Sequence, residues 1–214
     1  YTLQAKTEVD NSTYKNLPFN LIEIENWLTK NLPPGNKLGF DPWLHSEQQV
    51  NKLRSACIQK GIELIATEEN LIDSIWQNQP PQPISLSKSH KLKYAGKTSR
   101  NKCQMLSKEL LATHSDALLI SAPDSIAWLL NIRGEDVPFN PFTLSFALFY
   151  KDSSLDWFVD SRKITGGLLK NLGSKVKVKE PESLKRYLNA LAAKGKTIHI
   201  CDTSSPFYLI QFLA

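Results

Sequence analysis

The sequence predicts an α/β fold in two modules, each built on a β-sheet flanked by helices, with mixed strand directions. The first observation is that short apolar runs typical of buried strands alternate with helical patterns along the chain. The second is a polar, proline-containing stretch at residues 77–95 that follows neither pattern. The third is charge, because residues 1–85 hold 7 basic and 10 acidic residues, whereas residues 86–214 hold 19 and 11. This change in net charge favours two modules.

The first module, residues 1–80, is expected to contain two strands, each followed by a helix. The strands are expected at 38–40 and 62–66. A capping-box pattern, Ser46 with Gln49, opens the first helix and Gly61 ends it. The apolar face of the second helix is expected to consist of Leu71, Ile72, Ile75 and Trp76. Two strands make a poor sheet, so either the first thirteen residues add a strand or the start of the module is missing.

Residues 81–95 are expected to form a linker, because proline at 80, 81 and 83 is excluded from helices and central strands. The second module, residues 96–214, is expected to be complete. Its strands are expected at 117–121, 142–150, 155–159, 175–178 and 197–201, with a hairpin turn at 151–154.

Helices are expected between most of these strands. A helix carrying Cys103, Leu106 and Leu110 should end near His114. Ser121 with Asp124 resembles a cap ahead of IAWLL. The last two helices are expected on the apolar residues 168–172, closed by Gly173, and 184–191, opened by Pro181 and closed by Gly195.

Composition argues against several classes of site. The cysteines, Cys57, Cys103 and Cys201, form no CxxC pattern, and the four histidines are scattered, so neither a disulfide framework nor a metal site is expected. No apolar run is long enough to cross a bilayer, and the first residues lack the pattern of a signal peptide, which favours a cytoplasmic protein. Seven basic residues and no acid occur between 88 and 108, but without a glycine-rich phosphate loop a solvated face is favoured over nucleic-acid binding.

Short motifs follow one another in a recognisable order. They are YTLQA at 1–5, PGNKLGFDPW at 34–43, NLIDSIW at 70–76, YAGK at 94–97 and DSIAWLLNIRGEDVPFNP at 124–141. In this order they resemble the three-domain Xaa-Pro aminopeptidases (aminopeptidase P) of the creatinase and prolidase superfamily. The resemblance implies that the chain is the C-terminal half of one creatinase N-terminal-like domain plus a complete second one. Ala122-Pro123-Asp124 departs from the family's usual Leu-Asp-Glu.

The resemblance also implies a reaction that this chain does not perform by itself. Family members remove the N-terminal residue that precedes proline, using two divalent metal ions, usually manganese, that activate a water. The ligands lie in a C-terminal catalytic domain of the pita-bread fold. No catalytic residue, metal ligand or cofactor is therefore expected in this chain, which should be inactive alone. The expected partners are that catalytic domain, a proline-containing peptide and, as a further expectation, a second copy of the chain.

One loop is the candidate substrate-access site. Its polar residues directly follow a strongly apolar helix, and they are Arg133, Gly134, Glu135, Asp136 and Asn140. In the family the non-catalytic domains cover the mouth of the active site, so this loop is expected to face the cleft. Arg133 could hold a peptide carboxylate bidentately. The alternative is that Arg133 pairs with Glu135 or Asp136 and only fixes the turn.

Two other functions remain open at this stage. The first is a catalytically inactive, peptidase-like binding module for a protein or peptide partner, for which a basic second module would suit an acidic partner. The second is a structural partner of a separately encoded catalytic chain. The residues downstream of Ala214 would discriminate the enzyme from the binding module.

Overall fold

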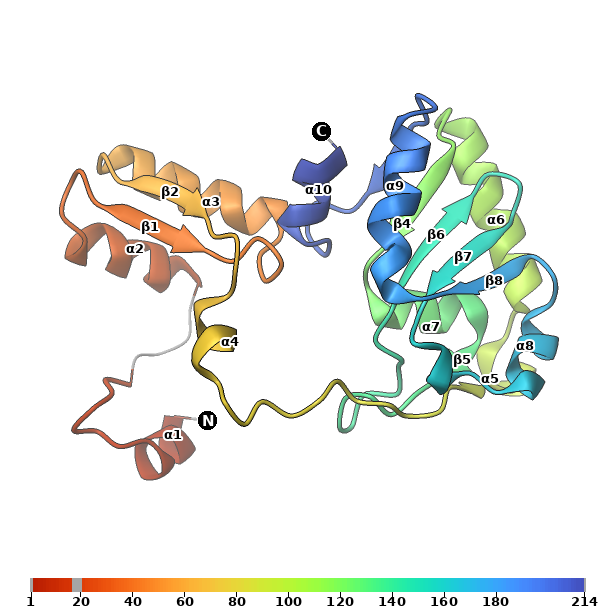
Figure 1. The fold of residues 1–214 in the computed structure, drawn as a ribbon, viewed down its shortest axis with the longest axis horizontal. Helices are drawn as coiled ribbons and strands as arrows, with labels where there is room; N and C mark the ends of the chain where they lie inside the picture. The colour runs from red at the N-terminus through yellow and green to blue at the C-terminus, as the bar shows by residue number, and fades with distance from the viewer. Residues whose placement is uncertain (1, 17–20, 214) are drawn as a thin grey trace. The chain divides into compact units, whose positions relative to one another are not determined.

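The computed structural model describes residues 2–16 and 21–213, which fall into two compact units (Figure 1). The first unit comprises residues 1–41 and 48–69, and the second comprises residues 42–47 and 70–214. Residues 70–95 thus cluster with the second unit. Whether the chain holds half of one domain, a linker and a complete second domain, with boundaries at 80 and 95, stays a prediction.

The first unit is a two-stranded parallel sheet with helices. Its elements are α1 (Thr2–Glu8), α2 (Leu21–Asn31), β1 (Lys37–Phe40), most of α3 (Glu47–Gln59) and β2 (Glu63–Ala66). Val50 and Cys57 of α3 are buried, and so is Phe40 of β1. The first thirteen residues add no strand where they are described, because residues 2–8 form α1. Residue 1 lies outside the described part.

The first unit is expected to unfold locally more easily than the second. Two strands bury little apolar surface, and local stability follows buried contacts. We predict that the amide protons of β1 and β2 exchange with solvent at least about tenfold faster than those of the central strands of the second unit. Hydrogen exchange followed by mass spectrometry measures this directly. Equal protection in both units would contradict the prediction.

The second unit contains a mixed sheet covered by helices on both faces (Figure 1). Its strands are β3 (Lys88–Ser89), β4 (Ala117–Ile120), β5 (Ile132–Arg133), β6 (Phe146–Tyr150), β7 (Leu155–Phe158), β8 (Val176–Lys179) and β9 (Ile198–Ile200). Its α-helices are α4 (Leu71–Ile75), α5 (Leu92–Ala95), α6 (Ser99–Ala112), α7 (Pro123–Leu130), α8 (Gly166–Leu172), α9 (Leu184–Ala192) and α10 (Phe207–Leu213). Two 3-10 turns, η1 (Ser161–Lys163) and η2 (Pro181–Ser183), complete it.

Within the described residues the sheet has the strand order β8-β7-β6-β4-β9. β6 pairs antiparallel with β4 and β7, while β8 and β9 add in parallel at the edges, so the predicted mixed sheet is confirmed. Side chains alternate between two cores, as the pleat requires. In β7, Trp157 packs on the face covered by α6, α7 and α8, whereas Phe158 packs on the face covered by α9 and α10.

Three local predictions were wrong. Ser121 and Asp124 do not cap α7, because Ala122 occupies the N-cap without a side-chain bond and the Ser121 hydroxyl contacts that of Ser205 at 2.8 Å. The strand expected at 142–150 begins only at Phe146, because residues 142–145 belong to the loop before it. The apolar face expected for α4 is exposed, with Leu71 and Ile75 each 72% accessible.

The segment 42–47 is held against α10 within the second unit. The amides of Phe207 and Tyr208 donate to the carbonyl oxygens of His45 (2.7 Å) and Pro42 (2.9 Å). The ring of Trp43 stacks on that of Tyr208 with centroids 4.5 Å apart, and the Lys185 ammonium lies 4.5 Å from the Tyr208 centroid. Stacking and cation–π contacts of this kind each add on the order of 1 kcal/mol. Trp43 therefore packs on α10 within the second unit.

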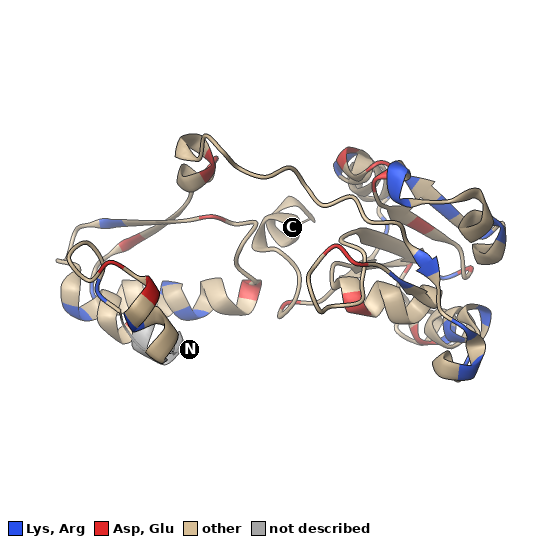
Figure 2. Cartoon of the chain, turned by 90° about the horizontal axis from the view of Figure 1, so that it is seen from below, with Lys and Arg blue, Asp and Glu red and all other residues tan. Residues whose placement is uncertain are grey.

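The basic run from 88 to 108 lies on β3, α5, α6 and the residues between them. Figure 2 shows the Lys and Arg residues of the whole chain in blue. Most of its side chains are exposed, as expected for a solvated face, but Lys102 is buried. Its ammonium donates to the carbonyl of Trp128 (2.7 Å) and to Oδ1 of Asn131 (2.6 Å), and it lies over the Trp128 ring. Burial lowers the pKa of Lys102, and Arg133 adds to this. Lys102 thus closes the C-terminus of α7.

Candidate functional site

The predicted access loop begins where α7 ends. Asn131 adopts a left-handed backbone (φ 52°, ψ 53°), which turns the chain out of the helix. Its side-chain amide donates to the carbonyl of Lys97 at 2.9 Å. The next two residues, Ile132 and Arg133, form β5, which pairs antiparallel with Ser89 and Lys88 of β3. The loop is therefore anchored at its start to a segment about 45 residues earlier in the chain.

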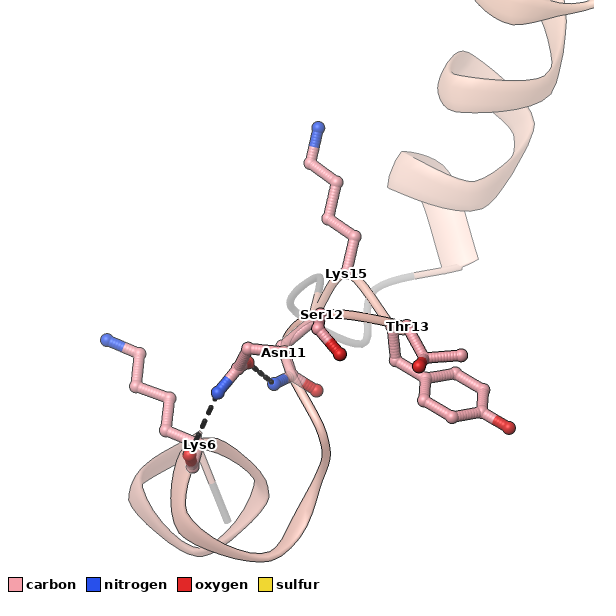
Figure 3. A pocket seen from close by; sticks show the side chains of 7 residues that line it. Lys6, Asn11, Ser12, Thr13 and Lys15 are labelled. Carbon is pink, nitrogen blue, oxygen red and sulfur yellow. Dashed lines mark hydrogen bonds between the residues drawn. The ribbon is translucent and has the colours of Figure 1, made fainter.

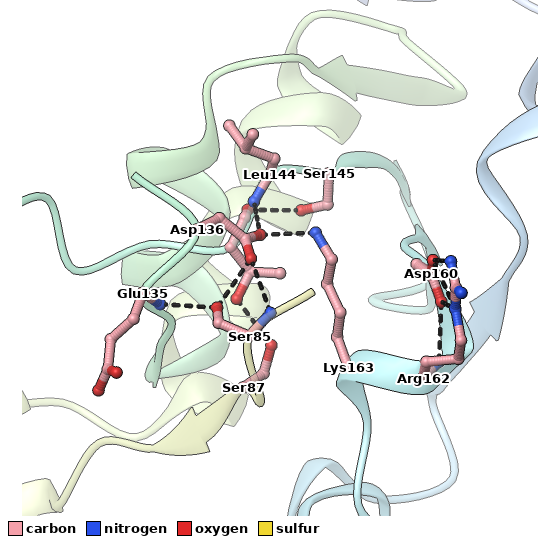
Figure 4. A network of polar contacts seen from close by, with 10 residues as sticks. Ser85, Ser87, Glu135, Asp136, Leu144, Ser145, Asp160, Arg162 and Lys163 are labelled. Carbon is pink, nitrogen blue, oxygen red and sulfur yellow. Dashed lines mark hydrogen bonds and ion pairs between the residues drawn. The ribbon is translucent and has the colours of Figure 1, made fainter. Parts of the chain in front are cut away.

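Asp136 is the centre of a buried polar network (Figure 4). Its side chain is fully buried and pairs with Lys163 at 2.6 Å. It also accepts hydrogen bonds from the Ser85 hydroxyl at 2.7 Å, the Ser85 amide at 3.2 Å and the Leu144 amide at 2.8 Å. Burial raises the pKa of Asp136, but these hydrogen bonds together outweigh it and leave the pKa below its ordinary value. Asp136 thus joins three segments as a carboxylate.

Gly134 is enclosed beside this network. A Cβ at this position would overlap Oγ1 of Thr143 and would lie 3.0 Å from the backbone of Phe142. The Thr143 hydroxyl is itself buried and lies 2.7 Å from that of Ser87. Only a residue without a side chain fits here, so Gly134 allows the close packing of the loop against residues 142–143.

The other predicted residues lie nearer the solvent. Glu135 is exposed and pairs with Lys88 at 3.0 Å. Arg133 is half-buried, and one nitrogen of its guanidinium donates to the carbonyl of Ile132 at 2.7 Å. The alternative that Arg133 pairs with Glu135 or Asp136 was wrong. Glu135 pairs with Lys88, and Asp136 pairs with Lys163. Asn140 is exposed, and its side-chain amide donates to the carbonyl of Pro138.

The tip of the loop carries an exposed aromatic ring. The backbone amide of Asn140 donates to the carbonyl of Val137 at 3.1 Å, which closes a tight turn over Pro138 and Phe139. Phe139 has φ +64° and is fully exposed. A bulky residue in the left-handed region is uncommon and strained. Sequence reasoning missed Phe139, although an aromatic residue between Pro138 and Asn140 in a turn-forming stretch was a usable signal.

Sequence reasoning also missed Ser85 and Lys163, for which no local signal existed. Ser85 lies in the stretch expected as a linker, 51 residues before Asp136, and Lys163 lies 27 residues after it. The carboxyl end of the expected linker is in fact bound to the second unit, because the Ser87 amide also donates to the carbonyl of Lys163 at 2.8 Å. Only the folded chain brings these groups together.

The first unit contains a hollow whose lining comes from a short local segment. A hollow of about 440 Å³ lies beside α1, and one local segment, residues 6–16, supplies its lining (Figure 3). In residues 2–16 and 21–213 no group of three or more His, Cys, Asp and Glu side chains could hold a metal ion. The side chains of these described residues therefore do not fit a metal centre. Nor is any helix in these ranges long and apolar enough to span a membrane.

Cys201 differs from the other two cysteines. Hydrogen bonds from Ser204 and Thr203 lower the pKa of its exposed thiol to about 7, whereas burial raises the pKa of Cys57 and Cys103. The thiolate is the reactive form, so the rate of alkylation by iodoacetamide should rise with pH around a midpoint of about 7. Replacing Thr203 and Ser204 by alanine should move this midpoint toward about 8.5. An unchanged midpoint, measured by mass spectrometry of the labelled thiol, would contradict the prediction.

A sequence profile of the creatinase/prolidase N-terminal domain matches residues 78–214. The chain belongs to this family. The match covers the mixed sheet, the buried network and the loop at 133–140. In the creatinase/prolidase N-terminal domain of this chain, the loop at 133–140 follows α7, is held by the buried contact of Asp136 with Lys163, and has an exposed tip.

The relatives of this creatinase/prolidase N-terminal domain protein include Xaa-Pro aminopeptidases. A probable Xaa-Pro aminopeptidase P of Talaromyces stipitatus is 34% identical over 199 residues, which cover 91% of this chain and 30% of the relative. Aminopeptidase P2 of Arabidopsis thaliana is 32% identical over 202 residues, covering 91% and 28%. The chain thus spans about a third of the length of these relatives and corresponds to their N-terminal region, as the motifs predicted.

A solved structure has the same fold. The X-prolyl aminopeptidase of Caenorhabditis elegans, described as a cytosolic enzyme with a di-nuclear active site, superposes with a TM-score of 0.81. The superposition covers 94% of this chain and 34% of that one, at 24% identity. This likeness supports the α/β fold and, at that identity, nothing finer.

Proposed function

We propose that this chain is the non-catalytic N-terminal region of a metal-dependent Xaa-Pro aminopeptidase. In this proposal a pita-bread catalytic domain supplies the active site and its two divalent metal ions, the substrate is a peptide with proline at its second position, and the setting is cytoplasmic. The observation that carries the proposal is the 34% identity to an Xaa-Pro aminopeptidase P over 91% of this chain.

The role of the region is to restrict access to the active site through the loop 133–140. Two features of the loop support this role. The buried contacts of Asp136 fix its base, and Pro138 and Pro141 restrict the backbone at its exit, which favours a rigid loop. Its tip presents Phe139 in a strained conformation, which persists only where the surroundings impose it. A rigid loop with an exposed ring can exclude long peptides without rearranging.

Within this proposal Arg133 orients the peptide. One nitrogen of its guanidinium is bound to the Ile132 carbonyl, which holds the side chain, and the group keeps further N–H donors. A planar guanidinium recognises a carboxylate bidentately, and the free carboxylate of a short peptide is such a group.

An aminopeptidase assay on short and long Xaa-Pro peptides with added manganese tests the proposal. The chain alone is expected to be inactive. Mixed with a catalytic domain from an Xaa-Pro aminopeptidase, it should lower the turnover of long peptides relative to short ones. Activity of the chain alone, surviving repurification and absent from a mock preparation, would overturn the proposal, as would a mixture whose length selectivity is unchanged.

Replacing Phe139 separates function from stability. Phe139→Asn removes an exposed ring and places a residue that tolerates the left-handed region, so the free energy of unfolding should rise by up to about 1 kcal/mol. Length selectivity in the mixture should nonetheless fall. Leu111→Asn, at a 55% exposed position on α6, is the matched control and should leave selectivity unchanged. Unchanged selectivity in Phe139→Asn would mean that the ring does not restrict access.

A binding module for a protein or peptide partner is the second candidate, and the full exposure of Phe139 favours it. Loss of capture of a defined partner in Phe139→Asn, with no effect in the peptidase mixture, would support this candidate over the first.

A further inference from the structure

A hollow of about 520 Å³ lies in the second unit, and no residue of the access loop at 133–140 lines it. Three segments line it: the first half of α6, the β6–β7 turn and the α8–β8 turn. Its size is in the range of pockets that bind small molecules. A second hollow of about 690 Å³ shares Gln104 and Ser153 with it and continues along α6.

The two cationic side chains that line the first hollow come from separate segments. Arg100 belongs to the first turn of α6, where Thr98 accepts from the amide of Asn101 at 3.1 Å. Lys175 precedes β8, and its backbone carbonyl accepts from the Leu155 amide at 2.9 Å. The Lys175 ammonium also donates to the carbonyl of Asp152 at 2.6 Å, which directs it toward the β6–β7 turn. Backbone contacts thus fix both attachment points independently of any ligand.

Among the residues that the structure describes, neither of these positive charges forms an ion pair with a carboxylate. In residues 2–16 and 21–213, no acid lies within ion-pair distance of Arg100 or Lys175, and no acid lines either hollow. The Asp152 carboxylate lies within the field of Lys175, but it accepts from the amide and hydroxyl of Ser154. The adjoining hollow adds Lys97 and Lys108. An array of like charges that form no ion pairs repels itself and favours an anion.

The rest of the first hollow combines apolar and polar groups. Cys103, Leu172 and Val176 contribute apolar surface, and Cys103 is buried. Ser99, Ser153 and Ser174 contribute hydroxyl groups that can donate to an oxyanion. A fully hydrated inorganic ion would leave the apolar part unused, whereas an anion attached to an apolar group would cover it.

We propose that this hollow binds a small organic phosphate ester, with the phosphate between Arg100 and Lys175 and the organic group against Cys103, Leu172 and Val176. A phosphate ester carries nearly two negative charges at neutral pH, which match the two cations. Arginine binds phosphate through two parallel N–H donors, and lysine adds a point charge. No residue of the loop at 133–140 lines the hollow, and the test measures ligand binding rather than peptidase activity, so this proposal and the proposed function can fail separately.

The binding of phenyl phosphate to the 214-residue chain, measured by isothermal titration calorimetry, tests the proposal. Saturable binding at one site is expected, with inorganic phosphate at least about tenfold weaker because it lacks the apolar group. Arg100→Ala and Lys175→Ala should each weaken phenyl phosphate at least about tenfold, since each removes hydrogen bonds between charged groups. Arg100→Lys should recover part of the loss.

Lys170→Ala is the matched control. Lys170 is an exposed lysine on α8 that does not line either hollow, and its replacement changes the net charge by the same amount. Binding weakened equally by Lys170→Ala would show unspecific attraction to a basic surface and overturn the proposal. So would the absence of saturable binding, or equal affinities for phenyl phosphate and inorganic phosphate. Thermal unfolding of each variant is measured to check that the fold is retained.

Discussion

Asp136→Ala is expected to lower the free energy of unfolding of the second unit by about 3–5 kcal/mol, because it leaves the buried ammonium of Lys163 without its partner. The Lys163 side chain is 6% exposed and cannot reach water without moving. The hydroxyl and amide of Ser85 and the amide of Leu144 also lose their acceptor. Chemical denaturation monitored by circular dichroism measures the change.

Two further variants test whether the loss of stability in Asp136→Ala comes from the buried charge of Lys163. Glu135→Ala removes the neighbouring carboxylate, whose pair with Lys88 is exposed, and should change stability by less than about 1 kcal/mol. Replacing Asp136 by leucine and Lys163 by methionine together should recover part of the loss, since no charge is left buried. A loss of less than about 1 kcal/mol in Asp136→Ala would show that the network does not hold the loop.

The same carboxylate should give the chain a distinct acid sensitivity. The pKa of Asp136 is lower in the folded state, so its stabilising contribution is present above the ordinary pKa of about 4 and is lost as the pH falls through the folded value. The difference in unfolding free energy between the unchanged chain and Asp136→Asn should therefore shrink below about pH 4. A difference that is constant from pH 7 to pH 3 would contradict this assignment.

Gly134→Ala is expected to destabilise the second unit by about 1–3 kcal/mol or more, since the added methyl group overlaps Thr143 and the backbone of Phe142. The Thr143 hydroxyl cannot simply rotate away, because it is buried and paired with that of Ser87. Thermal unfolding should show a lower midpoint for this variant.

Gly167→Ala is the control for the backbone effect of glycine. Gly167 lies in α8 with open space around its missing Cβ, so alanine there should stabilise by about 0.5–1 kcal/mol. A double-mutant cycle of Gly134→Ala with Thr143→Ala should show coupling of at least about 0.5 kcal/mol. Independent, additive effects would mean that the two residues do not clash.

Much of the fold could be predicted because it depends on local patterns. β4, β7, β8 and β9 lie within one or two residues of the expected strands. Gly173 closes α8 at φ +80°, as a glycine after a helix suggests. The apolar face of α4 misled because periodicity reports only that residues share a face, not that another element covers it. The loop before β6 was read as strand because Phe142 and Leu144 continue the alternation.

The site could be predicted only in part. The loop was found from its sequence because its polar residues directly follow the apolar helix, and its family from the order of the motifs. The sequence did not indicate which residues of the loop face solvent. Asp136 and Glu135 are adjacent acids of similar intrinsic character, yet one is buried and the other exposed. Their difference depends on Lys163 and Ser85, which the chain supplies from distant positions.

By itself the sequence determined the α/β class, the strand–helix order of the second unit and membership of the creatinase/prolidase N-terminal domain family, since these rest on the spacing of apolar residues and on motif order. The tertiary structure alone decided that Asp136 and Gly134 support the loop while Phe139 projects from it, and that Arg100 and Lys175 share one hollow. The physical reason is that burial and charge pairing depend on distances in space between residues far apart in the chain, and no local pattern encodes those distances.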